Sequence, residues 1–221
     1  LRGFDVSGRG RFITFEGPEG SGKTTQIERL MTRLQGQAVA VLVCREPGGT
    51  QTGEAIRDIL QHDVTGEAIA PEAEALLFAA SRAQLVHTRI LPALEEGRWV
   101  LCDRFADSTT AYQGYGRSFG VERMQALNEF AINGAVPDQT FLIDIDPAEA
   151  RDRLASRNQS AGIGPDRIER ENGEFHARVR AGYLELANAE PDRFVVIDGS
   201  GSAGSIEQRI WKIIEQDVDN Q

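Results

Sequence analysis

Residues 17–24 are the segment of this sequence best suited to chemistry. They read GPEGSGKT and match the pattern G-x-x-x-x-G-K-[ST]. In such a loop the backbone N–H groups and the N-terminus of the next helix cradle the phosphates of a nucleoside triphosphate. We expect Lys23 to span the β- and γ-phosphates and the Thr24 hydroxyl to coordinate Mg²⁺. The predicted triphosphate-binding residues are Gly17, Pro18, Glu19, Gly20, Ser21, Gly22, Lys23 and Thr24.

The basic residues of the chain support this interpretation. Lys23 and Lys212 are its two lysines, whereas the other 22 of the 24 basic residues are arginines. A planar guanidinium does not replace a compact ammonium group on a flexible stem. A lysine at position 23 of so arginine-rich a chain therefore indicates a specific need for that group.

The loop lies between a predicted strand and a predicted helix, which is the context that it requires. Residues 12–15 form a short β-prone run, and apolar residues after the loop recur at helical spacing: Ile27, Leu30, Met31 and Leu34. Further strands are predicted at 38–44, 99–102, 140–145 and 194–197, and helices at 52–61, 71–96 (long or broken), 121–133, 148–156, 169–189 and 205–216. This alternation predicts an α/β fold with a five-stranded parallel sheet flanked by helices.

Three details of these elements are also predicted. The run 38–44 is continuously apolar, so we expect helices to cover both faces of that strand. Ser205 and Gln208 have the spacing of a capping box at the last helix. The polar stretch 158–165 lies between helices and is expected to be a flexible lid rather than a domain boundary.

Composition limits the class of protein. A chain of 221 residues fits a single domain, 1–221, in which residues 1–10 are expected to be a disordered lead-in without the apolar core of a signal peptide. The net charge of −10 argues against a nucleic-acid partner, and no apolar run is long enough to cross a membrane. Cys44 and Cys102 are expected to be small core residues of a protein in the reducing cytoplasm.

Arginines at predicted strand ends narrow the function. Arg45 and Arg104 follow the second and third strands, at the edge where ligands bind in open α/β sheets. Guanidinium forks there suit a second ligand that carries phosphate, so we expect a nucleotide kinase. The chain lacks the N-K-x-D motif of a GTPase and the L-S-G-G-Q motif of ABC proteins. The D-x-x-G match at 63–66 follows a predicted helix rather than a strand, and we interpret it as a turn.

Four segments of the chain together resemble the motifs of one enzyme family. They are residues 45–50 (REPGGT) with Arg57, residues 77–82 (LFAASR), residues 103–114 (DRFADSTTAYQG) and residues 166–169 (DRIE). In order and spacing they resemble the motifs of thymidylate kinases. That resemblance implies a P-loop nucleoside monophosphate kinase fold, and a cytoplasmic homodimer that phosphorylates dTMP with ATP and Mg²⁺ in dTTP biosynthesis.

The resemblance also implies roles for the residues of the acceptor site. Phe78 would stack on thymine, Arg82 would bond a thymine carbonyl, and Thr109 and Gln113 would lie along the base edge. The remaining expected acceptor contacts are Arg45, Arg57 and Arg104 to the phosphate, Glu19 to the 3′-hydroxyl, Tyr112 against C2′, and Pro47 and Ser108.

The expected mechanism relies on positive charge and needs no strong base. A phosphate monoester is largely ionised near neutral pH, so its oxygen is already a nucleophile. The P-loop contains no arginine, which resembles the type of thymidylate kinase whose catalytic arginines lie in the lid, here about 151–170. The predicted catalytic residues are Lys23, Arg104, Arg153 and Arg157, and the predicted Mg²⁺ residues are Thr24 and Asp103. Asp103 is expected to orient Arg104, to reach the metal through water, or to do both.

Two other functions remain open at this point. One is a kinase of the same fold that phosphorylates dGMP, dCMP or UMP, against which Phe78 and Arg82 argue. The other is a non-catalytic ATP-binding module. A degenerate P-loop or a lid without arginines would favour that module, and the sequence has neither feature.

Overall fold

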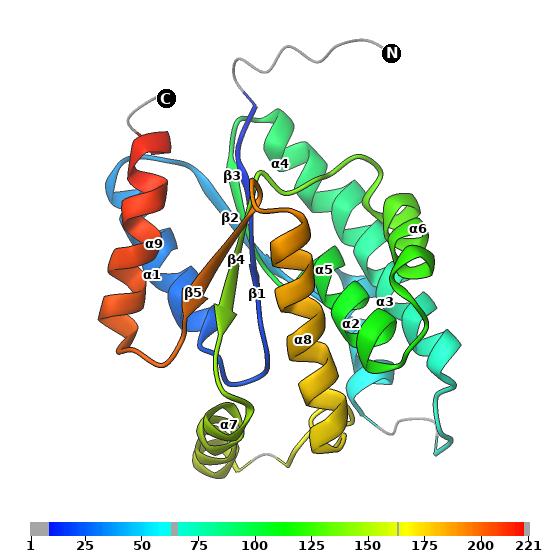
Figure 1. Ribbon diagram of the computed structural model, residues 1–221. Helices are drawn as coiled ribbons and strands as arrows, with labels where there is room; N and C mark the ends of the chain where they lie inside the picture. Colours follow the sequence, from blue (N-terminus) through cyan, green and yellow to red (C-terminus); the bar gives the residue numbers. More distant parts are fainter. Residues whose placement is uncertain (1–8, 63–65, 163, 219–221) are drawn as a thin grey trace.

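The sheet contains five parallel strands in the order β2-β3-β1-β4-β5, as shown by a computed structural model that describes residues 9–62, 66–162 and 164–218 (Figure 1). The strands are β1 (Phe12–Glu16), β2 (Val41–Arg45), β3 (Trp99–Asp103), β4 (Gln139–Asp144) and β5 (Phe194–Asp198). Every strand pair is parallel, so all carboxyl ends meet at one edge. This is the edge at which α/β proteins bind ligands, and the predicted fold class is confirmed.

Helices cover both faces of the sheet. Around it the described chain forms α1 (Lys23–Gly36), α2 (Gln51–Gln61), α3 (Pro71–Leu85), the π-helix η1 (Val86–Ile90), α4 (Leu91–Glu95), α5 (Ala106–Thr109), the π-helix η2 (Thr110–Gly116), α6 (Val121–Ile132), α7 (Pro147–Ala161), α8 (Gly173–Ala189) and α9 (Ala203–Val218). In Figure 1, α1 and α9 lie on one side of the sheet and α8 and α3 on the other, while α7 lies beyond the carboxyl ends of the strands.

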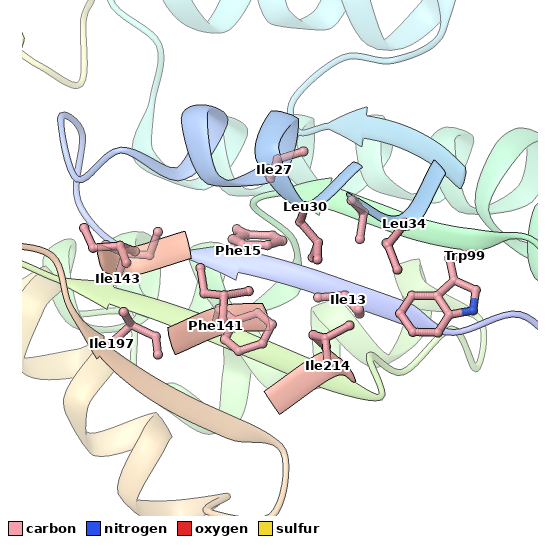
Figure 2. Packing of buried hydrophobic residues seen from close by; sticks show 13 residues of the cluster. Ile13, Phe15, Ile27, Leu30, Leu34, Trp99, Phe141, Ile143, Ile197 and Ile214 are labelled. Carbon is pink, nitrogen blue, oxygen red and sulfur yellow. The ribbon is translucent and has the colours of Figure 1, made fainter. Parts of the chain in front are cut away.

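The core beneath α1 and α9 fixes the direction of the P-loop. Phe15 and Phe141 of the sheet pack against Leu30 of α1, and Ile214 of α9 closes the same cluster (Figure 2). The helical spacing predicted from Ile27 to Leu34 gives the apolar face of α1. Because α1 starts at Lys23 and is held by this core, the loop before it is fixed against the end of β1.

Several predicted details of the elements are wrong. The second strand is an edge strand that begins at Val41, and one of its faces is open, with Val43 42% exposed. The capping box is also wrong: Ser205 lies inside α9, and its N–H donates to Ser202 Oγ. By contrast, the helical stretch predicted over 71–96 is confirmed, because α3, η1 and α4 follow one another from Pro71 to Glu95. The helical segment formed by α5 and η2 was not expected from the sequence pattern.

The lid differs from its predicted outline. Helix α7 continues to Ala161, so the first part of the stretch 158–165 is helical and not irregular. The next predicted helix begins later than expected, at Gly173, because Asn172 Oδ1 accepts the N–H of Phe175 and caps it there. Ile163, in the middle of the stretch, lies outside the described residues.

Parts of two other predictions also lie outside the described residues, namely 1–8 of the expected lead-in and 63–65 of the D-x-x-G turn. Gly10, near the end of the expected lead-in, is buried and donates its N–H to the Leu94 carbonyl.

The two cysteines, Cys44 and Cys102, are both buried, and neither forms a disulfide bond. Among the helices of the described residues, none has the length and apolar character to span a membrane.

Candidate active site

A cavity of about 970 Å³ opens at the carboxyl edge of the sheet. The P-loop, the ends of β2 and β3, and residues of α2, α3, η2 and the lid line it together. It contains most of the predicted site residues: Glu19, Gly20, Gly22, Lys23, Thr24, Arg45, Pro47, Arg57, Phe78, Asp103, Arg104, Ser108, Thr109, Tyr112, Gln113, Arg153 and Arg157. Gly17, Pro18, Ser21 and Arg82 are described by the structure but do not line the cavity.

The P-loop turns around the ammonium group of Lys23. Gly17, Gly20 and Gly22 all have positive φ angles, at 133°, 78° and 95°, which a side chain would strain. Lys23 Nζ donates to the carbonyl oxygens of Gly17 at 3.1 Å and Pro18 at 2.9 Å. Burial, followed by the charge of Arg104, lowers the pKa of Lys23. The ammonium group is therefore held at the mouth of the loop, where phosphate oxygens would offer it stronger partners.

Gly20 of the P-loop also packs directly against the lid helix α7. A Cβ atom built on it would lie 2.4 Å from the carbonyl oxygen of Ala150 in α7. The backbone of α7 thus rests directly on the P-loop, which leaves no room for a side chain at position 20. This contact places the first turns of the lid helix beside the phosphate-binding loop.

Thr24 and Asp103 meet at the end of the sheet. The Thr24 hydroxyl donates to Asp103 Oδ2 at 2.8 Å, and both residues line the cavity. Magnesium is commonly held by one or two oxygen ligands of the protein together with substrate phosphates. A hydroxyl and a carboxylate side by side next to the P-loop fit that requirement.

Arg104 is the centre of the charged network. It has a left-handed backbone, with φ at 67°, which is rare for a side chain other than glycine and is found at functional sites. Its guanidinium donates to Glu19 at 2.7 Å and to the hydroxyls of Ser108 and Tyr183, both at 3.2 Å. Although burial alone would raise it, the charges of Arg104 and Lys23 lower the pKa of Glu19 to about 2.

Glu16 and Tyr183 support Arg104 from below, and sequence reasoning missed both. Glu16 is buried and accepts the N–H of Phe105 at 2.8 Å, the Ser108 hydroxyl at 2.6 Å and the Tyr183 hydroxyl at 2.8 Å. Burial, followed by the charge of Asp107, raises its pKa. The carboxylate caps the start of α5 and fixes the hydroxyls that hold Arg104. The position of Glu16 at the end of β1, just before the glycine loop, was the feature of the sequence that could have identified it as a site residue.

Two further arginines, Arg45 and Arg57, also line the cavity. Arg45 donates to Glu54 at 2.7 Å, and Arg57 donates to the Pro47 carbonyl at 3.0 Å. Burial, followed by the charge of Arg45, lowers the pKa of Arg57, so the two guanidinium groups repel one another. An anion between them would relieve that repulsion.

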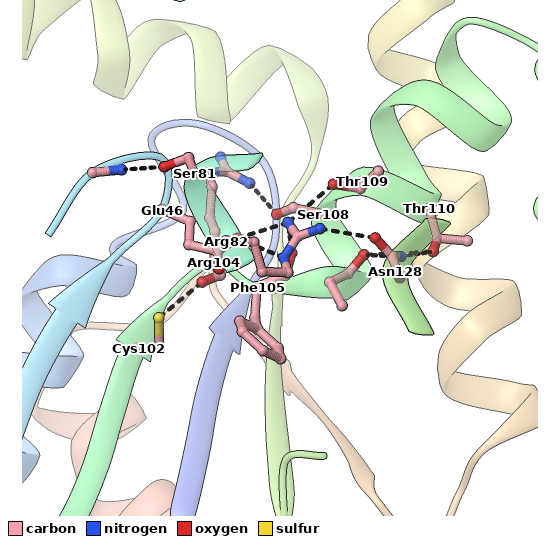
Figure 3. Close-up of polar contacts among 12 residues, drawn as sticks. Glu46, Ser81, Arg82, Cys102, Arg104, Phe105, Ser108, Thr109, Thr110 and Asn128 are labelled. Atoms are coloured by element: carbon pink, nitrogen blue, oxygen red, sulfur yellow. Dashed lines mark hydrogen bonds and ion pairs between the residues drawn. The ribbon is translucent and has the colours of Figure 1, made fainter. Parts of the chain in front are cut away.

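Phe78 and Arg82 lie on the same helix, α3, but their side chains have different surroundings. Phe78 is half-buried and lines the cavity, whereas Arg82 is 1% exposed and enclosed in polar contacts (Figure 3). Its guanidinium donates to Glu46 Oε2, to Asn128 Oδ1, to the Phe105 carbonyl and to Thr109 Oγ1 at 2.6 to 3.0 Å. Burial raises the pKa of Glu46 to about 7 even though the Arg82 charge opposes the shift.

The two predicted lid arginines lie one turn apart on α7 and both line the cavity. Arg153 is held by the Gly199 carbonyl at 3.0 Å and by Glu149 at 2.5 Å. Arg157 is more exposed, at 58%, and contacts Glu169 at 3.2 Å. The lid thus presents positive charge to the same space as the P-loop.

Comparison with known proteins shows the family to which the chain belongs. The family model for thymidylate kinase matches residues 15–210. A thymidylate kinase of Pelotomaculum thermopropionicum is 49% identical over 211 residues, covering 96% of this chain and 95% of the relative. Those of Thermoanaerobacter sp. and Deinococcus radiodurans are 47% and 46% identical over 208 residues, each covering 94% of this chain and 98% of the relative. The chain belongs to the thymidylate kinase family.

Proposed function

We propose that this protein transfers the γ-phosphoryl group of ATP to dTMP, giving ADP and dTDP for dTTP biosynthesis. The observation that carries the proposal is a single cavity that joins Lys23 of the P-loop to Arg45, Arg57 and Arg104. One set of charges suits a triphosphate and the other a monophosphate, and the γ-phosphorus would lie between them. An oxygen of the dTMP phosphate attacks the γ-phosphorus, and the bond between the γ-phosphorus and the β–γ bridging oxygen breaks.

The residues of the chain act by position and charge. Lys23 leaves the carbonyls of Gly17 and Pro18 for the β- and γ-phosphate oxygens. Thr24 and Asp103, whose side-chain oxygens lie 2.8 Å apart, would hold Mg²⁺. When bound, the ion neutralises charge on the phosphate oxygens. We assign no general base, because the acceptor phosphate is already ionised near neutral pH.

The acceptor nucleotide is oriented by the other wall of the cavity. Arg104, steadied by Glu19 and Ser108, holds its phosphate with Arg45 and Arg57. Glu19, ionised because of its low pKa, accepts the 3′-hydroxyl. Tyr112, whose ring lies 5.1 Å from the Arg104 guanidinium, packs against C2′ and excludes a ribose hydroxyl.

Phe78, Thr109 and Gln113 receive the base in this proposal, and Pro47 and Ser108 complete the wall. The direct contact between Arg82 and a thymine carbonyl that the resemblance implied requires a guanidinium free to face the cavity. Arg82 is enclosed by Glu46, Asn128 and Thr109 instead. We therefore propose that Arg82 orients Thr109 from behind.

Replacing Phe78 with alanine tests the position of the base. The stacking face is lost, so we expect the KM for dTMP to rise about 10-fold or more while the KM for ATP stays within about twofold. Steady-state kinetics with each substrate varied in turn measures both constants. Glu72→Gln, at an exposed position of the same helix, is the control. An effect confined to ATP would place the base elsewhere.

The substrate itself is tested by a coupled ADP-release assay across all common nucleoside monophosphates. We expect dTMP to give the highest kcat/KM, with UMP, dCMP and dGMP far behind. A higher value for dCMP, dGMP or UMP would assign the chain to another nucleotide specificity. ADP release with none of them would favour the non-catalytic ATP-binding module.

We also propose that the protein is a cytoplasmic homodimer, with α3 and α6 in its interface. These helices pack against each other and expose large apolar side chains, with Phe130 86% and Leu76 60% exposed. Phe130→Asp is expected to convert the dimer to a monomer in light scattering after size exclusion. Val196→Asp, which alters an exposed apolar residue of the edge strand β5, should leave the dimer intact. A wild-type monomer would refute the proposal.

A further inference from the structure

Glu74 is a buried carboxylate on which three parts of the cavity wall converge. Its side chain is 1% exposed and lies on α3, one helical turn before Phe78. Among the described residues its oxygens accept from Gln113 Nε2 at 2.8 Å, from Arg117 Nε and Nη2 at 3.3 and 3.1 Å, and from Arg167 Nη1 at 2.5 Å. Although burial alone would raise the pKa of Glu74, the hydrogen bonds and charges of these partners lower it.

The partners of Glu74 belong to different working parts of the site. Gln113, on η2, lines the acceptor cavity. Arg117 follows η2 and also pairs with Glu171 at 2.6 Å, just before α8. Arg167 belongs to the end of the lid, where its Nε donates to the Leu60 carbonyl of α2. The Glu74 carboxylate therefore links Gln113, which is proposed to receive the base, to the lid.

The same segment of the lid holds Arg157. Asp166 and Glu169 bind each other's backbone N–H groups, at 3.2 and 2.8 Å. Glu169 accepts from Arg157 at 3.2 Å and from Asn158 at 3.1 Å, and Asp166 accepts from Gln61 at 3.3 Å. Side-chain contacts thus run from Gln113 through Glu74 to Arg167. The chain itself joins Arg167 to its neighbours Asp166 and Glu169, and Glu169 binds Arg157.

We propose that Glu74 is a positioning residue that sets Arg157 over the phosphates through Arg167, and that couples this position to Gln113 in the acceptor site. The proposal rests on the proposed function, because it takes Arg157 as the group that meets the transferred phosphoryl. A buried carboxylate that binds two guanidinium groups is costly to disturb, since its loss deprives Arg167 of its ion pair with Glu74 and leaves Arg117 with Glu171. The contact between Glu74 and Arg167 therefore favours one position of the lid.

Glu74→Gln keeps the size of the side chain and removes the charge. We expect kcat to fall about 10-fold while the KM for ATP changes less than about twofold, because the contact acts on the transition state rather than on ATP binding. Arg167→Met, at a partly exposed position, should have the same effect and guards against misfolding of the first variant. The matched control is Glu207→Gln, since Glu207 also binds two arginines, Arg29 and Arg33, but between α9 and α1.

A double-mutant cycle with Arg157→Ala separates positioning from general support of the fold. If Glu74 acts through Arg157, Glu74→Gln should lower kcat less than about twofold further once Arg157 is gone. Hydrogen exchange of the amides in 164–170 should quicken in Glu74→Gln and Arg167→Met, with α1 and α9 unchanged. Multiplicative effects on kcat, or unaltered exchange at 164–170, would overturn the inference.

The outcomes distinguish this inference from the proposed function. If the wild-type protein prefers another nucleotide but the cycle is non-additive, the substrate assignment fails and the role of Glu74 stands. If dTMP is the substrate but the effects multiply, the role of Glu74 fails alone.

Discussion

Replacing Lys23 with alanine is expected to lower kcat by about 100-fold or more, because the positive charge between the β- and γ-phosphates is lost. The ammonium group sits between the carbonyls of Gly17 and Pro18, at 3.1 and 2.9 Å, within the turn of the P-loop. Lys23→Arg should be nearly as poor, since a planar fork does not fit a place shaped for three tetrahedral donors. The measurement is kcat at saturating ATP and dTMP.

The second lysine of the chain supplies the control for this prediction. Lys212 lies exposed on α9, on the face of the sheet away from the acceptor wall. Lys212→Ala should leave kcat within about twofold, as expected for a surface substitution remote from the site. Turnover by Lys23→Ala within about threefold of wild type would contradict the assigned role of the P-loop lysine.

The features that the sequence predicted well are local in origin. The P-loop is one continuous segment, and the helix behind it shows its apolar face at the spacing of Ile27 and Leu34. Arg45 and Arg104 were expected near each other because each follows a strand, and parallel strands end at one edge. The observed pairing of β2 with β3, which aligns Arg45 with Asp103, is the physical reason that this expectation is met.

The features that the sequence did not predict depend on partners far along the chain. Glu16 of β1 and Tyr183 of α8 are 167 residues apart, so their hydrogen bond depends on the way the chain folds and not on a local pattern. Arg82 has the spacing of a cavity residue, one turn after Phe78, yet Glu46 and Asn128 enclose it. Apolar periodicity does not report which polar side chain will find buried partners.

Strand position is a second kind of information that a single sequence withheld. The run 38–44 is apolar throughout, which is typical of a central strand. Its place at the edge follows from the order in which the chain returns to the sheet, and Val43 remains 42% exposed as a result. A local pattern does not contain that order.

The lid arginines give the second large prediction, and the structure gives them an order. The P-loop contains no arginine, and the contact of Gly20 with Ala150 leaves no space for a side chain there. An arginine that supplements Lys23 at the transferred phosphoryl group must therefore come from another element. Arg157 is 58% exposed and lines the cavity beside Glu169, so a phosphate in the cavity can reach its guanidinium group. Arg153 is tied to both Gly199 and Glu149.

Arg157→Ala is therefore expected to lower kcat by about 100-fold or more, with Arg153→Ala next in effect, by analogy with arginine fingers. The contact forms mainly in the transition state, so kcat should fall far more than either KM rises. The measurement is kcat at saturating ATP and dTMP, with Arg209→Ala on exposed α9 as a near-neutral control. If both lid variants keep wild-type kcat, the lid is not the arginine donor. The charge would then have to be met by Arg45, by Arg104 or by a residue of the second subunit in the proposed homodimer.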